Sequence, residues 1–303
     1  MALSTKTIKR RIKSIANTKK ITKAMEMISA VKMRRAVANA SATRSYAELA
    51  WQMLQDVVKQ AHVSLHPLLV VRPVKKIGLI LITSNRGLAG GFTSKLLQDV
   101  HNHILETKKT TGAEVEVIVM GRKGKRIYQN FGHVITAEFE KIDLTNQIAE
   151  ILPMADLVAQ EYEEGKYDQI EVAYMDFISA IRQEPRIKQI FPLRSQSLVG
   201  QVLPARTYDD DEVEEIEEPI LKFEPNPTKV LHVLLPRLIE MQLYRAVLES
   251  DASEHSARMM AMQAASDAAS DMIKELNTTF NNARQAAITK EIAEVIGGAA
   301  ALE

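Results

Sequence analysis

Cysteine is absent from this chain of 303 residues. Without thiols there is no disulfide framework, no thiol redox switch and no cysteine-ligated metal site. Aromatic residues make up only 5% of the chain. No apolar run reaches the roughly 18 residues that a membrane-spanning helix needs, and the N-terminus lacks the apolar core of a signal peptide. We therefore expect a protein that is soluble or peripheral to a membrane.

Excess charge of one sign is also absent, because the formal net charge is +1. Its distribution is uneven, however: eleven Lys and Arg residues lie between Met1 and Arg35, against Glu26 as the single acid. Such a basic segment either binds nucleic acid or faces an acidic protein surface, and we favour the second. The acidic run Asp209–Glu218 is either a solvated loop or a contact patch.

The first segment, from about Ser4 to Ala61, contains neither proline nor glycine. Its apolar residues recur at steps of three and four, the spacing of a helix face that packs against a partner helix. We assign residues 1–61 to this segment, and a helix from Ser4 to Ala61 would be roughly 85 Å long. We expect its seam to begin at Ile8, Ile12 and Ile15, to shift in phase to Ile21, Met25 and Ile28, and to continue through Ala36, Ala40, Thr43, Ala47, Ala50, Leu54 and Val57.

The last segment, residues 228–303, has the same character. Asn226 followed by Pro227 predicts a helix N-cap and a proline in the first turn, while Pro236 predicts a kink or the true start of the helix. The pattern is expected to end only at Gly297 and Gly298. At about 100 Å, this helix is too long for a globular domain. Its expected seam is Leu238, Met241, Arg245, Leu248, Ala252, His255, Met259, Met262, Ser266, Ala269, Ile273, Leu276, Phe280, Ala283 and Ala287.

Residues 74–200 differ, because predicted strands alternate there with predicted helices. This order is typical of a small Rossmann-like α/β domain with a largely parallel sheet. The expected fold class is α/β: a long antiparallel coiled coil of the terminal helices with this domain inserted, followed by an acidic connecting segment at 201–227. The expected strands are 74–83, 114–120, 169–177 and about 187–192, and the expected helices are 93–105, 121–130 and 144–164.

The sequence SNRGLAGG, from Ser84 to Gly91, follows a strand and precedes a helix, where Rossmann-like folds bind phosphate. Its glycine spacing fits neither G-x-G-x-x-G nor the P-loop pattern, so we interpret it as a tight turn and expect no bound cofactor. The histidines lack metal-site spacing, and no nucleophile-elbow sequence is present. We therefore predict neither a catalytic site nor a metal site.

Three stretches resemble the γ subunit of F-type ATP synthases: NTKKITKAMEMISAVKMRR from Asn17 to Arg35, SEHSARMMAM from Ser253 to Met262, and NARQAAITKE from Asn282 to Glu291. The turn from Ser84 to Gly91 is similar to a fourth motif of that family. Their order and spacing agree with the family over nearly the whole chain.

The resemblance implies a non-catalytic central-stalk subunit of a rotary motor. Its partners would be an α3β3 hexamer, an ε subunit and the c-ring of the membrane sector, with no nucleic acid. Rotation of the ring, driven by ion flow, would change the conformation of the β catalytic sites. The implied location is the cytoplasmic face of a bacterial plasma membrane, peripheral to the bilayer. The rival hypothesis is a nucleotide- or RNA-acting α/β enzyme with a basic helical arm.

The resemblance also assigns contacts to the β subunits, on both terminal helices. Lys20, Lys23, Met25, Arg34 and Arg35 would lie near an acidic helix-turn-helix of β. A second group would meet a loop of β higher in the ring, and it consists of Arg284, Gln285, Thr289 and Glu291. Ala89 stands where many members of the family carry a cysteine. Photosynthetic eukaryotic members also insert a segment with a regulatory dithiol, and since this chain is too short for all of that segment and has no cysteine, no redox control is expected.

Overall fold

The computed structural model describes residues 5–60, 66–144, 147–193 and 223–300. Most of the acidic connecting segment expected at 201–227 lies outside these residues. The chain divides into two compact units, one made of residues 1–31 and 258–303 and the other of residues 32–257. Each unit is described by itself.

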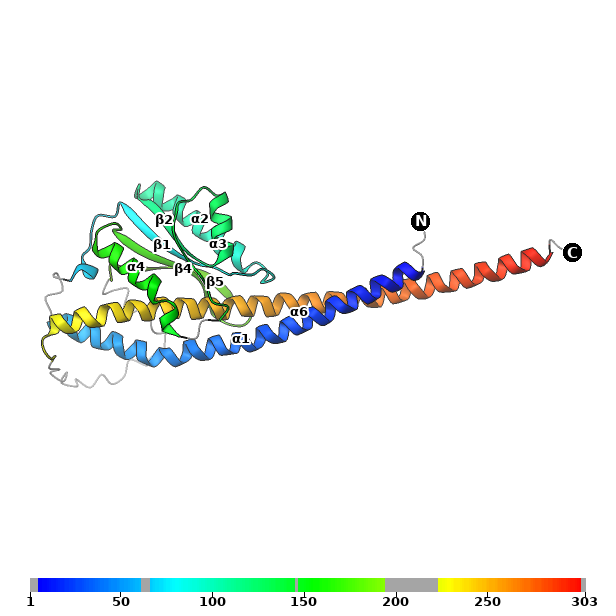
Figure 1. The fold of residues 1–303 in the computed structure, drawn as a ribbon, viewed down its shortest axis with the longest axis horizontal. Coiled ribbons are helices and arrows are strands. Elements are labelled where there is room, and N and C mark those ends of the chain that lie inside the picture. The colour runs from blue at the N-terminus through cyan, green and yellow to red at the C-terminus, as the bar shows by residue number, and fades with distance from the viewer. Residues whose placement is uncertain (1–4, 61–65, 145–146, 194–222, 301–303) are drawn as a thin grey trace, which may run out of the picture. The chain divides into compact units, whose positions relative to one another are not determined.

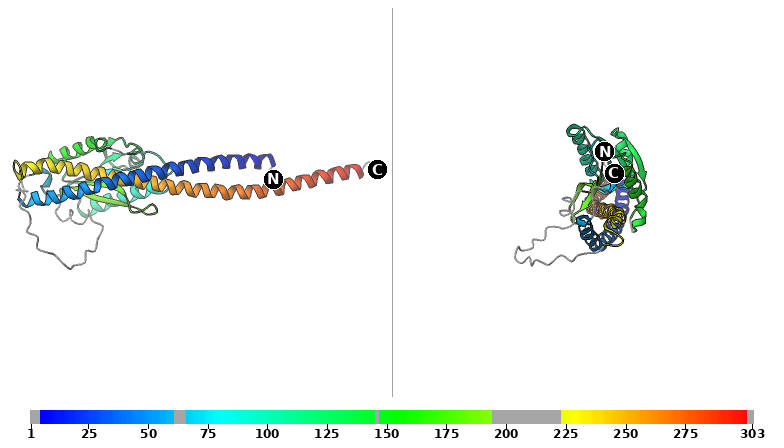
Figure 2. Two further views of the ribbon diagram at one scale, coloured as in Figure 1. Left: turned by 90° about the horizontal axis from the view of Figure 1, so that it is seen from below. Right: turned by 90° about the vertical axis from the view of Figure 1, so that its left-hand side faces the viewer.

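Two long helices contribute to both units. Helix α1 spans Thr5–Gln60 and helix α6 spans Pro227–Ala300, with 56 and 74 residues. Within each unit they run antiparallel and side by side (Figures 1 and 2). The absence of proline and glycine in α1, and its many residues of high helix propensity, explain why that helix is not interrupted. No helix in the described part of the chain is long and apolar enough to cross a membrane.

The start of α6 agrees with the prediction. The Asn226 side chain accepts a hydrogen bond from the Lys229 backbone N–H at 2.9 Å, which satisfies one of the free donors at a helix N-terminus. Pro227 is the first helical residue, where its missing N–H costs nothing. Pro236 lies inside the helix, so it does not mark the true start. The helix also continues through Gly297 and Gly298 to Ala300.

The seam of α1 in the first unit differs from the prediction. Thr22 and Ser29 are buried, whereas Ile21 and Ile28 are 61% and 56% exposed. The expected phase shift is therefore wrong. A step of seven residues from Ile8 leads through Thr22 and Ser29 without a break, because a coiled-coil seam follows spacing even where its residues are polar. Thr22 and Ser266 hydrogen-bond to each other there, with 2.7 Å between their hydroxyl oxygens.

The seam of α6 in the first unit is as predicted up to Ala283, but the last expected seam residue, Ala287, is exposed. Met262, Ser266 and Ala269 are buried. The half-buried positions that continue the same spacing are Ile273, Leu276, Phe280 and Ala283.

The second unit contains a five-stranded sheet with the strand order β3-β2-β1-β4-β5. The first four strands in this order are parallel, and β4 pairs with β5 in the antiparallel direction. The strands are β1 (Lys76–Ile82), β2 (Glu114–Met120), β3 (Ile135–Phe139), β4 (Gln169–Phe177) and β5 (Gln183–Phe191). The helices between them are α2 (Phe92–Thr110), α3 (Arg122–Asn130) and α4 (Leu152–Glu163), with short 3-10 turns η2 (Pro67–Leu69) and η3 (Ile148–Glu150).

Both faces of the sheet are covered. In β1, Leu79 and Leu81 point to the core beneath α2 and α3, whereas Ile80 and Ile82 point to the core shared with α4, α1 and α6. This alternation follows from the two-residue period of a strand. It explains why β1 is apolar at consecutive positions, as parallel strands covered on both faces are.

Several elements of the sheet unit differ from the prediction. Helix α2 ends at Thr110 instead of 105, β5 begins at Gln183 instead of about 187, and two differences are larger. The edge strand β3 has no counterpart among the expected strands, and α4 begins at Leu152 instead of Leu144. Pro153 lies in the first turn of α4, where proline favours a helix start. In β3, half-buried and exposed residues alternate over only five positions, a pattern too short to stand out in the sequence.

Candidate functional site

The glycine-rich turn after β1 uses its polar side chains within the protein. The Ser84 and Thr93 hydroxyls hydrogen-bond to each other at 2.8 Å. The Asn85 side chain accepts from the Arg122 backbone N–H at 3.1 Å and donates to the carbonyl oxygen of Lys141. The first two N–H groups of α3 are both occupied, because Lys123 N–H donates to Ser84 O at 3.0 Å. These contacts support the interpretation of the motif as a tight structural turn.

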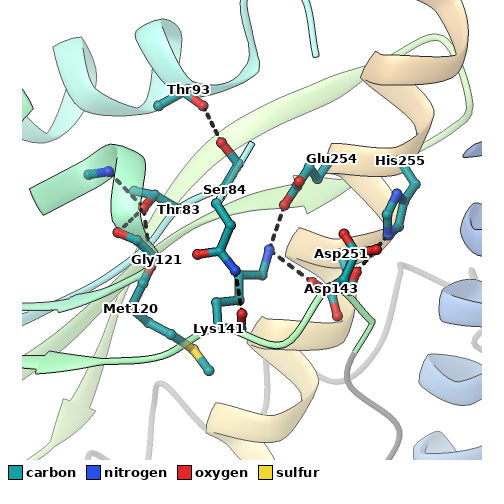
Figure 3. Close-up of polar contacts among 12 residues, drawn as sticks. Thr83, Ser84, Thr93, Met120, Gly121, Lys141, Asp143, Asp251, Glu254 and His255 are labelled. Carbon is teal, nitrogen blue, oxygen red and sulfur yellow. Dashed lines mark hydrogen bonds and ion pairs between the residues drawn. The ribbon is translucent and has the colours of Figure 1, made fainter. Parts of the chain in front are cut away.

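Thr83, directly before that turn, fixes the start of α3. Its hydroxyl lies 3.1 Å from the carbonyl oxygens of Met120 and Gly121, and it accepts from the Gly124 N–H at 3.0 Å (Figure 3). Gly121 has φ of 105°, and a Cβ atom there would overlap the Thr83 carbonyl. Only glycine satisfies both the left-handed backbone and the close approach.

A buried ion cluster lies beside the turn. Lys141, after β3, contacts Asp251 and Glu254 of α6, with Nζ···O distances of 2.9 Å and 2.7 Å. We call these three residues the Lys141 cluster (Figure 3). Burial by itself would lower the pKa of Lys141, but the charges of Asp251 and Glu254 and their hydrogen bonds outweigh it, so the pKa is raised above its ordinary value. Lys141 is therefore charged at neutral pH.

The residues next to the Lys141 cluster connect the same elements. His255 Nε2 lies 3.0 Å from the carbonyl oxygen of Asp143, and the Asp143 carboxylate pairs with Lys32 of α1. Burial would raise the pKa of Asp143, but the hydrogen bond and charge of Lys32 lower it overall. The segment 141–143 is thus held by α6 and by α1.

The predicted β-contact residues of α1 lie on its surface. Lys20, Lys23, Arg34 and Arg35 are exposed, while Met25 is half-buried. Lys23 forms an ion pair with Glu26 at 2.7 Å. Among these five residues the structure therefore leaves four cations exposed and keeps Met25 partly covered. Lys20 and Lys23 belong to the first unit, and Arg34 and Arg35 to the second.

The second predicted group lies on one stretch of α6 in the first unit. Arg284, Gln285, Thr289 and Glu291 are all exposed. The Thr289 hydroxyl donates to the Gln285 carbonyl oxygen at 3.0 Å, a contact within the helix. Their side chains are available to a partner chain.

The sequence reasoning missed apolar surface residues on α1. Ile21, Met27, Ile28 and Val31 are each more than half exposed. Correct seam phasing, with a step of seven from Ile8, would have placed them outside the seam. The sequence reasoning also did not single out the Lys141 cluster, because Lys141 is more than 100 positions from Asp251 and Glu254. No group of three or more His, Cys, Asp or Glu residues with metal-binding geometry occurs in the part of the chain that the structure describes.

These observations define a class of protein: a Rossmann-like α/β unit inserted between two terminal helices that pair with each other. A family described as ATP synthase matches residues 4–302. The ATP synthase gamma chain of Heliobacterium modesticaldum is 40% identical over 97% of this chain and 98% of the relative. That of Alkaliphilus metalliredigens is 35% identical over the full length of both. The chain therefore belongs to the family of ATP synthase gamma chains.

Solved structures agree on the fold. The rotor of the mitochondrial ATP synthase from Euglena gracilis includes a chain with a TM-score of 0.61 and 16% identity, covering 94% of this chain and 98% of its own length. A chain from the central stalk and c-ring of the Tetrahymena thermophila mitochondrial enzyme gives a TM-score of 0.58 at 22% identity, covering 81% of this chain and 99% of its own length.

Proposed function

We propose that this chain is the rotating central shaft of an F-type ATP synthase. One observation carries the proposal: curated gamma chains match it at 35% and 40% identity over essentially the whole length. Its partners are the α3β3 hexamer, the ε subunit and the c-ring of the membrane sector. Ion flow turns the c-ring and this chain together, and ATP hydrolysis turns them in the opposite direction.

Coupling needs no chemistry from the chain itself, and its role is non-catalytic. Each rotary position presents different side chains to each β subunit. A shaft that contacts one β conformation better than another shifts the population of that β subunit, and with it the affinity for ADP, phosphate and ATP. The exposed cations of α1 and the exposed polar residues near Arg284 on α6 are suited to such contacts.

The contacts with β are proposed to be weak and numerous. An ion pair between exposed side chains contributes about 0–1 kcal/mol, so it forms and breaks readily as the shaft turns. The contact set is Lys20, Lys23, Met25, Arg34 and Arg35 near an acidic helix-turn-helix of β, with Arg284, Gln285, Thr289 and Glu291 at a second loop. The proposed location is the cytoplasmic face of a bacterial plasma membrane, peripheral to the bilayer.

Reconstitution tests this function. The chain is mixed with α and β subunits of its own enzyme, and assembly and ATP hydrolysis are measured with and without it. We expect a single copy of the chain per complex of three α and three β subunits, and hydrolysis that depends on it. A complex that forms and hydrolyses ATP equally well without the chain contradicts the proposal. The rival, an α/β enzyme with a helical arm, requires turnover of a nucleotide or RNA by the chain alone.

A further inference from the structure

The Lys141 cluster connects two parts of the sheet unit that apolar packing alone would hold less firmly in register. Lys141 follows the edge strand β3, whereas Asp251 and Glu254 belong to α6 (Figure 3). The three side chains are 2%, 1% and 7% exposed. Buried ions gain little net stability compared with apolar residues of similar size, because desolvation offsets their attraction. Stability alone is therefore a poor explanation for charges in this position.

The Lys141 cluster adds directional contacts to the apolar packing between the sheet and α6. Apolar contacts depend on area and tolerate small sliding movements, whereas ion pairs and hydrogen bonds depend on distance and angle. Asp251, Glu254 and His255 are three and four residues apart, so they project from one face of α6. All three hold the segment 141–143, through Lys141 and the carbonyl oxygen of Asp143.

The same segment is connected to the carboxyl edge of the parallel strands. Asn85 donates to the Lys141 carbonyl oxygen and accepts from the Arg122 N–H, which links the turn after β1 with the start of α3. One residue beyond His255, the Ser256 hydroxyl donates to the Ala180 carbonyl oxygen of the β4–β5 hairpin at 2.6 Å. Residues 251–256 of α6 therefore hold the loops that follow β3 and β4 directly, and the turn after β1 indirectly through Lys141.

We propose that the Lys141 cluster is the link through which torque passes between the sheet and α6. This inference rests on the proposed rotary function. A twisting force on the sheet displaces the segment 141–143 relative to α6. The directional hydrogen bond from Lys141 to Glu254 and the short ion pair of Lys141 with Asp251 resist that displacement. The sequence motif from Ser253 to Met262 then serves the interior of this chain as well as its outer surface.

Single-molecule rotation of the assembled complex tests the inference. Because the chain has no cysteine, one introduced cysteine gives one attachment site. Lys108→Cys places a probe on the exposed end of α2, which packs on the sheet, and we call it the sheet probe. Lys229→Cys places a probe on the exposed first turn of α6, and we call it the α6 probe. The variance of the probe angle during pauses measures how firmly each element follows the rotor.

Lys141→Met keeps the approximate length of the side chain and removes the cation of the Lys141 cluster. We expect the angular variance of the sheet probe to rise at least about twofold, because the link opens locally while the rest of the chain stays folded. The α6 probe should be unchanged. The control is Lys125→Met, which removes a surface ion pair with Glu138 in the same part of the sheet unit and should alter neither probe.

Glu254→Gln provides a second variant, because it keeps the shape of the side chain and removes one charge. Hydrogen exchange of residues 84–86 and 141–143 should be faster in both cluster variants than in Lys125→Met. If either cluster variant assembles and rotates with the sheet probe as steady as in the unaltered chain, the torque link is wrong. A chain that fails to assemble with α and β in its unaltered form contradicts the rotary function instead.

Discussion

Seven consecutive residues of α6, from Ser250 to Ser256, are buried, although six of them are polar or charged. Their hydrogen bonding is unequal. Ser256 donates to the Ala180 carbonyl oxygen at 2.6 Å. The hydroxyls of Ser250 and Ser253 have no hydrogen-bond partner among the described residues. A buried hydroxyl without a partner destabilises a fold. Replacing Ser253 and Ser256 by alanine should therefore change the stability in opposite directions.

Ser253→Ala should stabilise the protein by about 1 kcal/mol, because it removes an unsatisfied buried hydroxyl and raises helix propensity. Ser256→Ala gains the same helix propensity, but it should still destabilise the protein by about 1 kcal/mol, because the loss of a formed buried hydrogen bond outweighs that gain. For a unit of this size each change shifts the melting temperature by roughly 2–4 °C, in opposite directions. Differential scanning calorimetry of both variants checks the sign. Equal shifts would contradict the assigned hydrogen bonding.

We expect His66 to make the stability of the protein sensitive to acid. Burial, and then the charge of the neighbouring His232, lower its pKa to about 4. The unfolded chain therefore takes up a proton on His66 between about pH 6.5 and 4, and the folded chain does not. Stability should fall as pH falls through this range, by up to about 1.4 kcal/mol per pH unit from this residue. Urea unfolding at several pH values measures the slope.

His66→Asn is the matched variant, because an asparagine oxygen also accepts from the Leu68 N–H, which now bonds to His66 at 3.3 Å. His66→Asn should reduce the loss of stability per pH unit in the acid range. His103 provides a control of opposite sign: its hydrogen bond to Glu171 at 2.7 Å raises its pKa. The stability from His103 is present below its unfolded pKa and is lost as pH rises through the folded pKa. His103→Gln should therefore leave the acid slope of His66 in place.

At the scale of elements, the long helices separate seam positions from partner-facing positions. Ile8 is 1% exposed and Ile21 is 61% exposed, on the same helix in the same unit. Ile8→Ala should destabilise the pairing of α1 with α6 by about 2–3 kcal/mol, while Ile21→Ala should cost less than about 0.5 kcal/mol. Amide exchange of residues 5–31 should be faster for the first variant alone. Equal protection in both would show that the seam is assigned to the wrong face.

Sequence patterns predicted the presence of the helices and strands better than they predicted which residues of a helix face its partner. Asn226 and Pro227 marked the start of α6 because a helix cap is a local interaction. The seam of α1 at Ile21 and Ile28 was wrong because Thr22 and Ser29 occupy the buried positions. Hydrophobicity identifies a seam only where the seam is apolar, and here the partner supplies Ser266, a polar residue.

The Lys141 cluster was less predictable than the fold, because the residues that form it lie far apart along the chain. The contacts of Lys141 with Asp251 and Glu254 join residues 110 and 113 positions apart. No local period encodes such a pairing. In contrast, the outward-facing positions of Lys20 and Arg35 agree with the prediction, because exposure of a charged residue on a helix follows from its local sequence. Their role in contacting β stays a prediction.

At the scale of the whole molecule, the proposed contacts of α1 should act together. Lys20 and Arg35 are both exposed, and neither belongs to a buried cluster. The double variant Lys20→Glu with Arg35→Glu changes the net charge by four units without disturbing the core. If these cations meet an acidic surface of β, the variant replaces attraction by repulsion at two contacts. Each exposed pair is worth about 0–1 kcal/mol, so assembly should survive while force transmission weakens.

Inverted membrane vesicles measure the result as ions pumped per ATP hydrolysed. We expect this ratio to fall in the double variant, and to recover partly at high salt, because added salt screens charges on the surface. Lys108→Glu with Lys109→Glu on α2 makes the same change in net charge on exposed residues outside the predicted contact set, and it should leave the ratio unaltered. If both double variants reduce the ratio equally, net charge explains the effect and Lys20 and Arg35 are not contacts. If neither changes it, the charged contact set on α1 does not transmit force, and the exposed apolar residues of α1, such as Ile28, become the surface to test.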